Sequence, residues 1–427
     1  MRLGFLGLIF FASPLSLCAA DEFKAGAAKS DITPPKGYAM WGYGARHDKP
    51  SDGVLDHLFA RALVLEVGKE RIAIVSLDLG RAPTRQSTEA IRTKVKAAVG
   101  IEHLFLVASH THHGPVLEVD NWPDAKKPYV RELEQKLSNV IVEAAKALQP
   151  ARLGIASKEV PFNCNRHSKR ADKPVDKELL VLRVEDSEGK PLAHAVNFAA
   201  HPTLQDPKAL KFSADYPGAM AALVEKETAA PCLFLQSAAG DLSANPGTEA
   251  GPEKFGIRLG REVMDLANTI SCKALDKPTL RATEDDFRFK SRIDLGNPLI
   301  KGMFVKAFFQ DLVDFYEREY REGVQPHLTT VLLDNRVGFV GVSGEFFCGH
   351  SISLKRRARL EHLFFLGYCN DYQQYFPTIE ASSEGGYGAD PAVSPVETGA
   401  GEQMMDRALI RLYKMQRKLP DLPPEKK

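Results

Sequence analysis

The stretch LFLVASHTHHGPV, Leu104–Val116, joins an apolar run to a cluster of histidines. The run is typical of a buried strand and stops at Ser109. Three of the next four residues are histidines, although the chain has only 12 in 427 residues. Such a cluster is either a solvated loop or a metal site, because neutral imidazole is a common metal ligand. Alternate side chains of an extended segment share a face, so we expect His110 and His112 to point into one crevice and His113 elsewhere.

Four other apolar runs also end abruptly in polar, reactive residues. They are HAVNFAA before His201, CLFLQSAAG before Asp241-Leu242-Ser243, VGFVGVSG before Glu345, and LFFLGYCN before Asp371-Tyr372 and Tyr375. Taken singly, each has an ordinary explanation, such as a core histidine, a solvated turn acid or a residue that caps a turn. Ligands bind at the carboxyl ends of strands in α/β sheets, so the five ends together predict one site.

The rest of the chain predicts an α/β fold with mixed α+β layers. Short apolar runs alternate with helical patterns, and no internal repeat or flexible linker interrupts them. Arg71–Leu79 is expected to be a buried strand, and helices are expected over Gln86–Val99, Tyr129–Leu148 and Ile257–Asn268. Gly385–Gly401 is rich in Gly, Ala and Pro and is expected to be a long loop.

The N-terminus has the layout of a cleavable secretory signal over residues 1–20. A basic residue precedes an apolar run from Leu3 to Leu15, and small residues lead to a cleavage site after Ala20. A lipoprotein signal ending at Cys18 is the alternative, against which the bulky residue before that cysteine argues. We therefore expect a secreted or periplasmic protein whose residues 21–427 form a single catalytic domain, with a frayed tail from about residue 419.

The charge balance and the cysteines exclude several classes. After residue 20 the chain has 55 basic and 55 acidic side chains, which gives no electrostatic signal for nucleic acid or an anionic membrane. No later segment reaches the roughly 18 apolar residues that span a bilayer, which leaves only peripheral contact with lipid. Five cysteines remain, without a CxxC, so neither a disulfide framework nor a thiolate zinc site is predicted, although one disulfide stays open. Nothing in the sequence implies a protein partner.

The residue types at the strand ends suit a catalytic zinc ion. Such an ion takes three nitrogen or carboxylate ligands and keeps a position for water, and two histidines with one glutamate are a known set. His110, His201 and Glu345 supply that set from three strand ends. His112 is then expected to work beside the metal.

At these residues the chain resembles the neutral ceramidases and their bacterial relatives. The family's SHTHSGP motif is similar to SHTHHGP at Ser109–Pro115, and its GDVSPN motif is similar to GDLSAN at Gly240–Asn245. Its Gly-Glu-Phe motif resembles Gly344–Phe346. A later stretch with two tyrosines three residues apart resembles GYCNDYQQYFPT at Gly367–Thr378. Further stretches also resemble the family and occur in its order: AGAAKSDITPP, MWGYG, the Asn165-Arg166 pair and VDKE.

The resemblance implies a neutral-ceramidase-like catalytic domain that hydrolyses amides with zinc and splits ceramide into a fatty acid and a sphingoid base. It implies zinc ligands at His110, His201, Glu345 and Tyr375. It also implies an active-site histidine at His112, a substrate-site arginine at Arg166, a proposed nucleophile at Ser243 and, with the weakest local match, a tyrosine at Tyr387. Ser243 either attacks the substrate or orients water, and we expect orientation because zinc already activates a nucleophile. Asp241 is expected to hold the turn or a ligating histidine.

Departures from the family leave the substrate open. His113 replaces the family's serine, Pro202-Thr203-Leu204 replaces its GTS, and the family's C-terminal β-sandwich has no counterpart after Tyr375. A zinc hydrolase of the same fold acting on a more polar amide or ester is therefore an alternative. A non-catalytic lipid- or glycan-binding protein with structural zinc is a second. A long apolar groove favours ceramide and a short polar pocket favours the polar substrate, and the aromatic segment Met303–Tyr316 either lines such a groove or belongs to the core.

Overall fold

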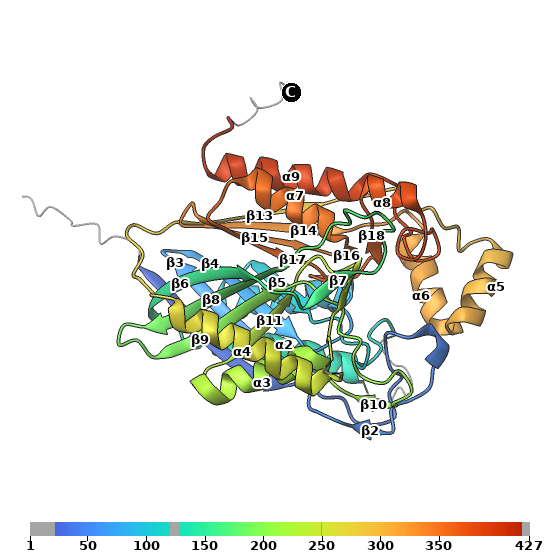
Figure 1. The fold of residues 1–427 in the computed structure, drawn as a ribbon, viewed down its shortest axis with the longest axis horizontal. Coiled ribbons are helices and arrows are strands. Elements are labelled where there is room, and N and C mark those ends of the chain that lie inside the picture. The colour runs from blue at the N-terminus through green and yellow to red at the C-terminus, as the bar shows by residue number, and fades with distance from the viewer. Residues whose placement is uncertain (1–21, 120–127, 249, 421–427) are drawn as a thin grey trace, which may run out of the picture.

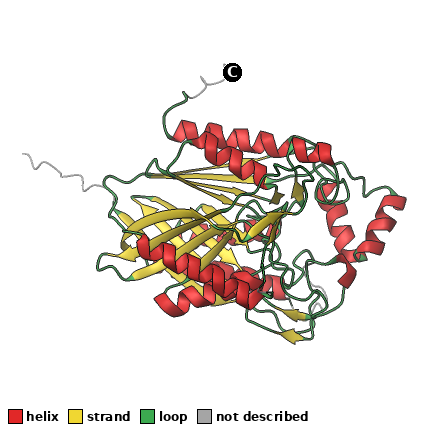
Figure 2. Cartoon of the chain, in the orientation of Figure 1, coloured by secondary structure: helices red, strands yellow, loops and turns green. Residues whose placement is uncertain are grey.

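The computed structural model describes residues 22–119, 128–248 and 250–420. The predicted signal peptide, residues 1–20, lies outside this part of the chain, as does the end of the predicted tail, residues 421–427. Strands gather between helices in mixed α/β layers (Figures 1 and 2), which confirms the predicted fold class. No helix of the described ranges is both long and apolar enough to cross a bilayer. Cys164, Cys232, Cys272, Cys348 and Cys369 are all free thiols.

The first layer of strands is a four-stranded unit in the order β1-β3-β4-β5. Its strands are β1 (Phe23–Asp31), β3 (Phe59–Val67), β4 (Glu70–Leu77) and β5 (His103–Ala108), and α1 (Arg85–Val99) and α2 (Tyr129–Lys146) cover its outer face. Alternation along β3 decides the faces: Ala62 and Val64 pack under the helices, while Leu63 and Leu65 face the centre of the molecule. α1 begins after Thr84, whose side chain accepts a hydrogen bond from the backbone of Ser87.

The second layer continues the same sheet in the order β6-β8-β9-β11. Its strands are β6 (Gln149–Glu159), β8 (Glu178–Asp186), β9 (Pro191–Phe198) and β11 (Cys232–Gln236), and α3 (Asp215–Thr228) and α4 (Pro252–Thr269) pack on its outer face. β1 and β6 pair at two positions, Lys24 with Pro150 and Ala25 with Gln149, and so make the two layers one sheet. The helices α3 and α4 approach closely at Gly256, where a Cβ atom would lie 2.5 Å from the carbonyl oxygen of Tyr216.

The third layer is a separate sheet in the order β13-β14-β15-β17. Its strands are β13 (Leu280–Asp286), β14 (His327–Leu333), β15 (Val337–Val342) and β17 (His362–Leu366), and α7 (Cys348–Ala358) and α9 (Ala400–Met415) lie over its outer face in Figure 1. Between β13 and β14 the chain forms a helical hairpin of α5 (Pro298–Ala307) and α6 (Gln310–Tyr320). The short elements are β2 (Gly53–Val54), β7 (Asn163–Asn165), β10 (Lys211–Phe212), β12 (Leu242–Ala244), β16 (Glu345–Phe346), β18 (Tyr375–Phe376), α8 (Ile379–Glu384) and a 3-10 turn at Gly44–Arg46.

The inner faces of the three layers share one apolar core. It includes Leu63, Ile74, Phe105, Leu182, Leu235, Phe339 and Phe364, all fully buried. Hydrogen bonds then join the strand ends above this core. Nε2 of Gln236, at the end of β11, donates to the carbonyls of Ser109 at 3.0 Å and Ala200 at 2.8 Å, which follow β5 and β9. The backbone amide of Gly367, after β17, donates to the carbonyl of Gln236 at 3.0 Å.

The expected elements are present, with shifted limits. The strand predicted at residues 71–79 is β4, and the helix predicted at 86–99 is α1, which ends at Gly100 with a φ of 71°. α2 ends at Lys146, because Gln149 already belongs to β6. α4 starts five residues before the predicted position, at Pro252, which is a favourable first helical residue. The loop predicted near residues 385–401 runs from the end of α8 to the start of α9.

Candidate metal centre and active site

Three strand ends bring His110, His201 and Glu345 together, as the sequence predicts. His110 follows β5, His201 follows β9, and Glu345 follows β15. Nε2 of His110 lies 3.1 Å from Nε2 of His201, and Oε2 of Glu345 lies 3.4 Å and 3.0 Å from these nitrogens. All three side chains are buried. His110 has a φ of 70°, a left-handed conformation that is rare outside glycine and concentrates at functional sites.

Backbone carbonyls orient both imidazole rings. Nδ1 of His110 lies 2.8 Å from the carbonyl oxygen of Gly80, and Nδ1 of His201 lies 2.7 Å from that of Ala239. Nδ1 therefore carries the proton and donates, which leaves the Nε2 lone pairs directed at one another and at Glu345. Metal-binding histidines are usually held in this way by a hydrogen bond from the other ring nitrogen.

The arrangement fits a metal ion bound by nitrogen and oxygen. Ligands around a tetrahedral zinc ion lie roughly 3.3 Å apart, given zinc–nitrogen distances of about 2.0–2.1 Å. The three measured separations fall close to that value. Oε2 of Glu345 is buried and has no hydrogen-bond partner, as expected for a carboxylate oxygen reserved for a cation.

His112 lies close enough to this centre to be a metal ligand itself. Its Nε2 is 3.3 Å from Nε2 of His110, and the ligating atoms of His110, His112 and His201 all lie within 4.8 Å of one another. The histidine triplet is therefore a second way to complete a ligand set. His113 points away, as alternation predicts, and its Nε2 accepts a hydrogen bond from Nη2 of Arg46 at 2.6 Å.

Electrostatics keep the centre in the protonation states that a cation requires. Burial and then the charge of Arg166 lower the pKa of His201 to about 4. Burial and the neighbouring histidines also lower the pKa of His112 well below its ordinary value. Burial alone would raise the pKa of Glu345, but the proximity of His110 and His201 holds it well below its usual range. Neutral imidazoles and an ionised carboxylate are the forms that bind metals.

Arg166 and Tyr375 lie side by side at the edge of the centre. Nη2 of Arg166 lies 2.9 Å from Nε2 of His201, and it donates to the hydroxyl of Tyr375 at 3.1 Å and to the carbonyl of Gly240 at 3.0 Å. Tyr375 pairs with Glu345 through the parallel strands β18 and β16. Its hydroxyl is therefore next to the ligand triangle, with Arg166 as the link.

Asp241 holds the turn rather than a ligating histidine. Oδ1 accepts a hydrogen bond from the backbone of Cys348 at 2.7 Å and so caps the first turn of α7, which has no cap from its own preceding residue. Oδ2 accepts a hydrogen bond from the side chain of Asn165 at 2.8 Å, and the carbonyl of Asp241 accepts one from the backbone of Arg166 at 2.9 Å. Asp241 thereby places Arg166 against the centre.

Ser243 and Tyr387 lie around the centre without joining the ligand triangle. Ser243 is half-buried, and its backbone forms a parallel bridge with His201. Tyr387 is 67% exposed at the rim of the pocket, with its ring centroid 5.7 Å from that of Tyr375. The structure therefore brings every predicted site residue to one region, at differing distances from the histidines.

Tyr372, Trp41 and Gln236 support the centre but were not assigned roles from the sequence. The hydroxyl of Tyr372 donates to Oε1 of Glu345. The ring centroid of Trp41 lies 5.1 Å from that of His110, edge-on. Through its two hydrogen bonds, Gln236 holds the backbone directly before His110 and His201. Tyr372 and Trp41 stand in the GYCNDYQQYFPT and MWGYG stretches, so a signal existed for both.

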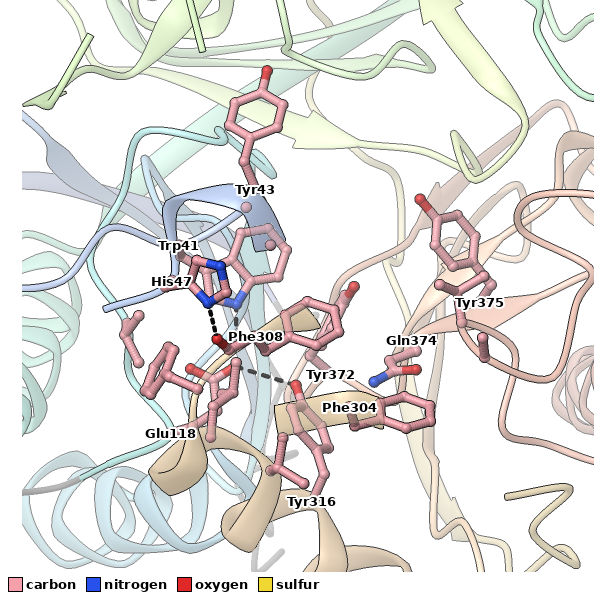
Figure 3. Close-up of a pocket in the computed structure, with 18 of the residues that line it drawn as sticks. Trp41, Tyr43, His47, Glu118, Phe304, Phe308, Tyr316, Tyr372, Gln374 and Tyr375 are labelled. Carbon is pink, nitrogen blue, oxygen red and sulfur yellow. Dashed lines mark hydrogen bonds between the residues drawn. The ribbon is translucent and has the colours of Figure 1, made fainter. Parts of the chain in front are cut away.

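An apolar pocket opens directly onto the centre. His112, Glu345, Tyr372 and Tyr375 form its polar end. The hairpin of α5 and α6 and the segment before it form an apolar wall, made by Ile293, Leu295, Phe304, Phe308, Phe309, Leu312 and Val313. Figure 3 shows Trp41 on one side of the pocket and Tyr375 with Gln374 on the other; Phe304 and Phe308 also line it.

A buried charge network fixes this wall to the body of the protein. Oε1 of Glu118 accepts hydrogen bonds from Nε1 of Trp41 at 3.1 Å and from the hydroxyl of Tyr316 at 3.2 Å. Arg81 is fully buried and joins Glu118 at 3.2 Å to Asp371 at 2.8 Å. The network therefore connects α6 with the loops after β4 and β17 (Figure 3 shows Glu118 and Tyr316).

Comparison with known proteins agrees with this geometry. The family model described as neutral/alkaline non-lysosomal ceramidase, N-terminal, matches residues 23–253, more than half of the chain. The fold is similar to the crystal structure of neutral ceramidase from Pseudomonas aeruginosa, with a TM-score of 0.77 and 20% identity over 94% of this chain and 76% of that one. It is also similar to a ceramidase complexed with C2, with a TM-score of 0.75 and 19% identity over 95% and 77% of the two chains. The chain therefore belongs to the neutral/alkaline non-lysosomal ceramidase family.

Proposed function

We propose that this protein is a zinc-dependent amide hydrolase that cleaves ceramide-like N-acyl lipids into a fatty acid and a sphingoid base. Membership of the ceramidase family supports amide hydrolysis. We further propose that residues 1–20 direct export and that residues 21–427 act as one catalytic domain in the periplasm or outside the cell.

The apolar wall is the observation that carries the choice of substrate. A lipid chain needs a continuous apolar surface that ends at the reacting atoms, because burying methylene groups supplies the binding free energy. Phe304, Phe308 and Leu312 offer such a surface, and Glu345 and His112 stand at its polar end. A small polar amide or ester would leave this surface in contact with water, so a lipid fits better than the polar alternative.

The metal would be held by His110, His201 and Glu345. Tyr375 is the candidate for a further ligand, since Arg166 joins its hydroxyl to the edge of this triangle. When bound, zinc supplies Lewis acidity that polarises an amide carbonyl and makes water a better nucleophile at neutral pH.

The protein's own groups then stabilise the charge that develops on the carbonyl oxygen. Arg166 is permanently charged and presents Nη2 beside His201 and Tyr375. The hydroxyl of Tyr375 is a second donor at the same edge. Both donors are held in place before the reaction, which is the condition for electrostatic stabilisation of a transition state.

Proton transfer falls to His112, and orientation to Ser243. His112 is half-buried, borders the pocket, and is neutral near pH 7, so it can accept a proton from water and return one to the leaving amine. We assign Ser243 to orienting water or the amide rather than attacking it, because its backbone lies against His201. In a Ser243→Ala variant we expect residual hydrolysis without an acyl-enzyme. Trapping of an acyl group on Ser243 in the unchanged protein would contradict this assignment.

The test is release of fatty acid from a fluorescent ceramide by purified protein with zinc, with a chelator, and with His110→Ala. We expect metal-dependent release that the substitution abolishes. If one zinc ion per chain is bound and no fatty acid is released, the substrate assignment is wrong. Release that persists in the chelated protein would instead contradict the metal assignment.

A further inference from the structure

Gln374 is a polar residue of the pocket that the proposed chemistry does not use. It directly precedes Tyr375 and has a φ of 60°, an uncommon conformation for a glutamine. Its carbonyl accepts a hydrogen bond from the backbone of Glu345 at 2.8 Å. The backbone of Gln374 is thus tied to that of Glu345, the residue proposed to hold the metal.

The side chain of Gln374 lines the pocket where the apolar wall begins. Phe304 also lines this pocket, and Figure 3 shows Gln374 on the same side of the pocket as Tyr375. Oε1 is buried and has no hydrogen-bond partner. An amide oxygen withdrawn from water without a partner is unfavourable, so turning the side-chain amide into the adjoining pocket to bond a ligand would break no existing hydrogen bond of Oε1.

We propose that Gln374 recognises a hydroxyl group on the amino-alcohol half of the substrate. This inference rests on the proposed function. A carboxamide both donates and accepts hydrogen bonds, and so does a hydroxyl, whereas the acyl chain offers neither. The donors beside the metal, Arg166 and Tyr375, are assigned to the amide carbonyl. Gln374 is therefore the specificity residue that distinguishes an acylated amino alcohol from a plain acylated amine.

The test compares three substrates that differ by one hydroxyl: a ceramide with a 12-carbon acyl chain, its 1-deoxy analogue and its 3-deoxy analogue. The unchanged protein should prefer the ceramide over one of the analogues by about 10–100-fold in kcat/KM, because a site built to bond a hydroxyl rejects the analogue without it. Gln374→Met keeps the length of the side chain and removes both polar atoms. The substitution should lower kcat/KM for the ceramide by the same factor. It should leave kcat/KM for the rejected analogue within about twofold of the value for the unchanged protein.

A matched control separates recognition from general damage. Leu312→Ala, also in the pocket wall, should lower kcat/KM for all three substrates alike. If Gln374→Met does not fold, Gln374→Asn withdraws the amide by one methylene and should reduce the preference severalfold, since asparagine tolerates the same backbone conformation.

Three results would overturn the inference. A preference that survives in Gln374→Met, or in Gln374→Asn if that variant replaces it, removes Gln374 from recognition. Equal kcat/KM for all three substrates in the unchanged protein would also remove Gln374 from recognition. The proposed hydrolase activity would then still stand. If the zinc-loaded protein cleaves none of the three, the proposed function fails and the inference falls with it.

Discussion

Oε2 of Glu345 lies 3.0 Å from Nε2 of His201, although the two residues follow strands of different sheets. His201 follows β9 in the eight-stranded sheet, and Glu345 follows β15 in the four-stranded sheet. The contact forms only because both sheets pack on the same core and Gln236 gathers the strand ends above it. The candidate centre is therefore a product of sheet packing rather than of any one loop.

Removing the hydroxyl of Tyr372 should weaken metal binding. This hydroxyl donates to Oε1 of Glu345 and thereby fixes the direction of Oε2. Loss of such a supporting hydrogen bond typically costs 10–100-fold in metal affinity, and we expect a zinc dissociation constant raised by about that factor in Tyr372→Phe. Competition with a chromogenic chelator measures it.

Tyr368→Phe is the matched control for that substitution. The ring of Tyr368 lies 4.3 Å from that of His110, but its buried hydroxyl has no hydrogen-bond partner. We expect no loss of zinc affinity in this variant. Equal weakening by both substitutions would show that loss of any buried hydroxyl near the centre, and not of the bond to Glu345 in particular, lowers the affinity.

Replacing Arg166 should slow the reaction without releasing the metal. Arg166 contacts His201 and Tyr375 but is not proposed as a ligand. Loss of one preorganised donor commonly lowers kcat by about 10²–10³-fold, and we expect this for Arg166→Met with KM and zinc content unchanged. Steady-state kinetics with metal analysis provide the measurement. A variant whose kcat stays within about fivefold of the unchanged protein would remove Arg166 from transition-state stabilisation.

Truncating Phe308 should affect long acyl chains more than short ones. Phe308 lines the apolar wall beside Phe304. Losing part of this surface should raise KM about tenfold for a 16-carbon acyl chain, by the usual free energy per buried area, and leave a 2-carbon chain nearly unchanged. Leu299→Ala is the control, because Leu299 lies in α5, the helix that ends directly before Phe308, is 82% exposed and does not line the pocket. Parallel changes for both chain lengths would contradict a role for Phe308 in holding the acyl chain.

The buried His194 on β9 should make the fold sensitive to acid. Burial and then the charge of Arg183 lower the pKa of His194 to about 4, while the unfolded chain keeps a value near 6.5. The unfolded state takes up the proton first as the pH falls, so this contribution to stability is complete above pH 6.5 and is lost toward pH 4. The loss amounts to about 2 kcal/mol at pH 5.

Urea unfolding of His194→Leu at pH 7.5 and pH 5, with chelator present to exclude metal release, tests this expectation. Between the two pH values the free energy of unfolding of the variant should fall by about 2 kcal/mol less than that of the unchanged protein. Identical pH dependence in the two proteins would mean that His194 takes up a proton in the folded protein as readily as in the unfolded chain.

The sequence could predict the centre because its members share a local signal. His110, His201 and Glu345 each follow an apolar run, and the carboxyl ends of strands converge. Glu118 carries no such signal, since its burial depends on Arg81, 37 residues earlier, and on Tyr316, 198 residues later. Partners that far apart are set by the packing of whole layers, which no local pattern records.

The aromatic segment at residues 303–316 is a second feature whose structure could not be predicted from the local sequence pattern. Helical spacing made these residues candidates for either a core or a groove. The chain breaks at Phe308 and Phe309 into α5 and α6, and the hairpin turns Phe304, Phe308, Phe309 and Tyr316 toward the pocket. The helical spacing of apolar residues does not reveal that the helix is interrupted at these two residues.

The shared core beneath the strand ends gives the metal a second effect. A cation held by His201 on one sheet and Glu345 on the other would act as a cross-link between these layers, in addition to their apolar contacts and to polar bonds such as that from Nδ2 of Asn197 to the carbonyl of Phe365. Each tenfold rise in free metal above its dissociation constant would add about 1.4 kcal/mol to the resistance of the native state against opening. Because proteolysis tracks the population of open forms, metal supply would set how long a molecule persists as well as how fast it works.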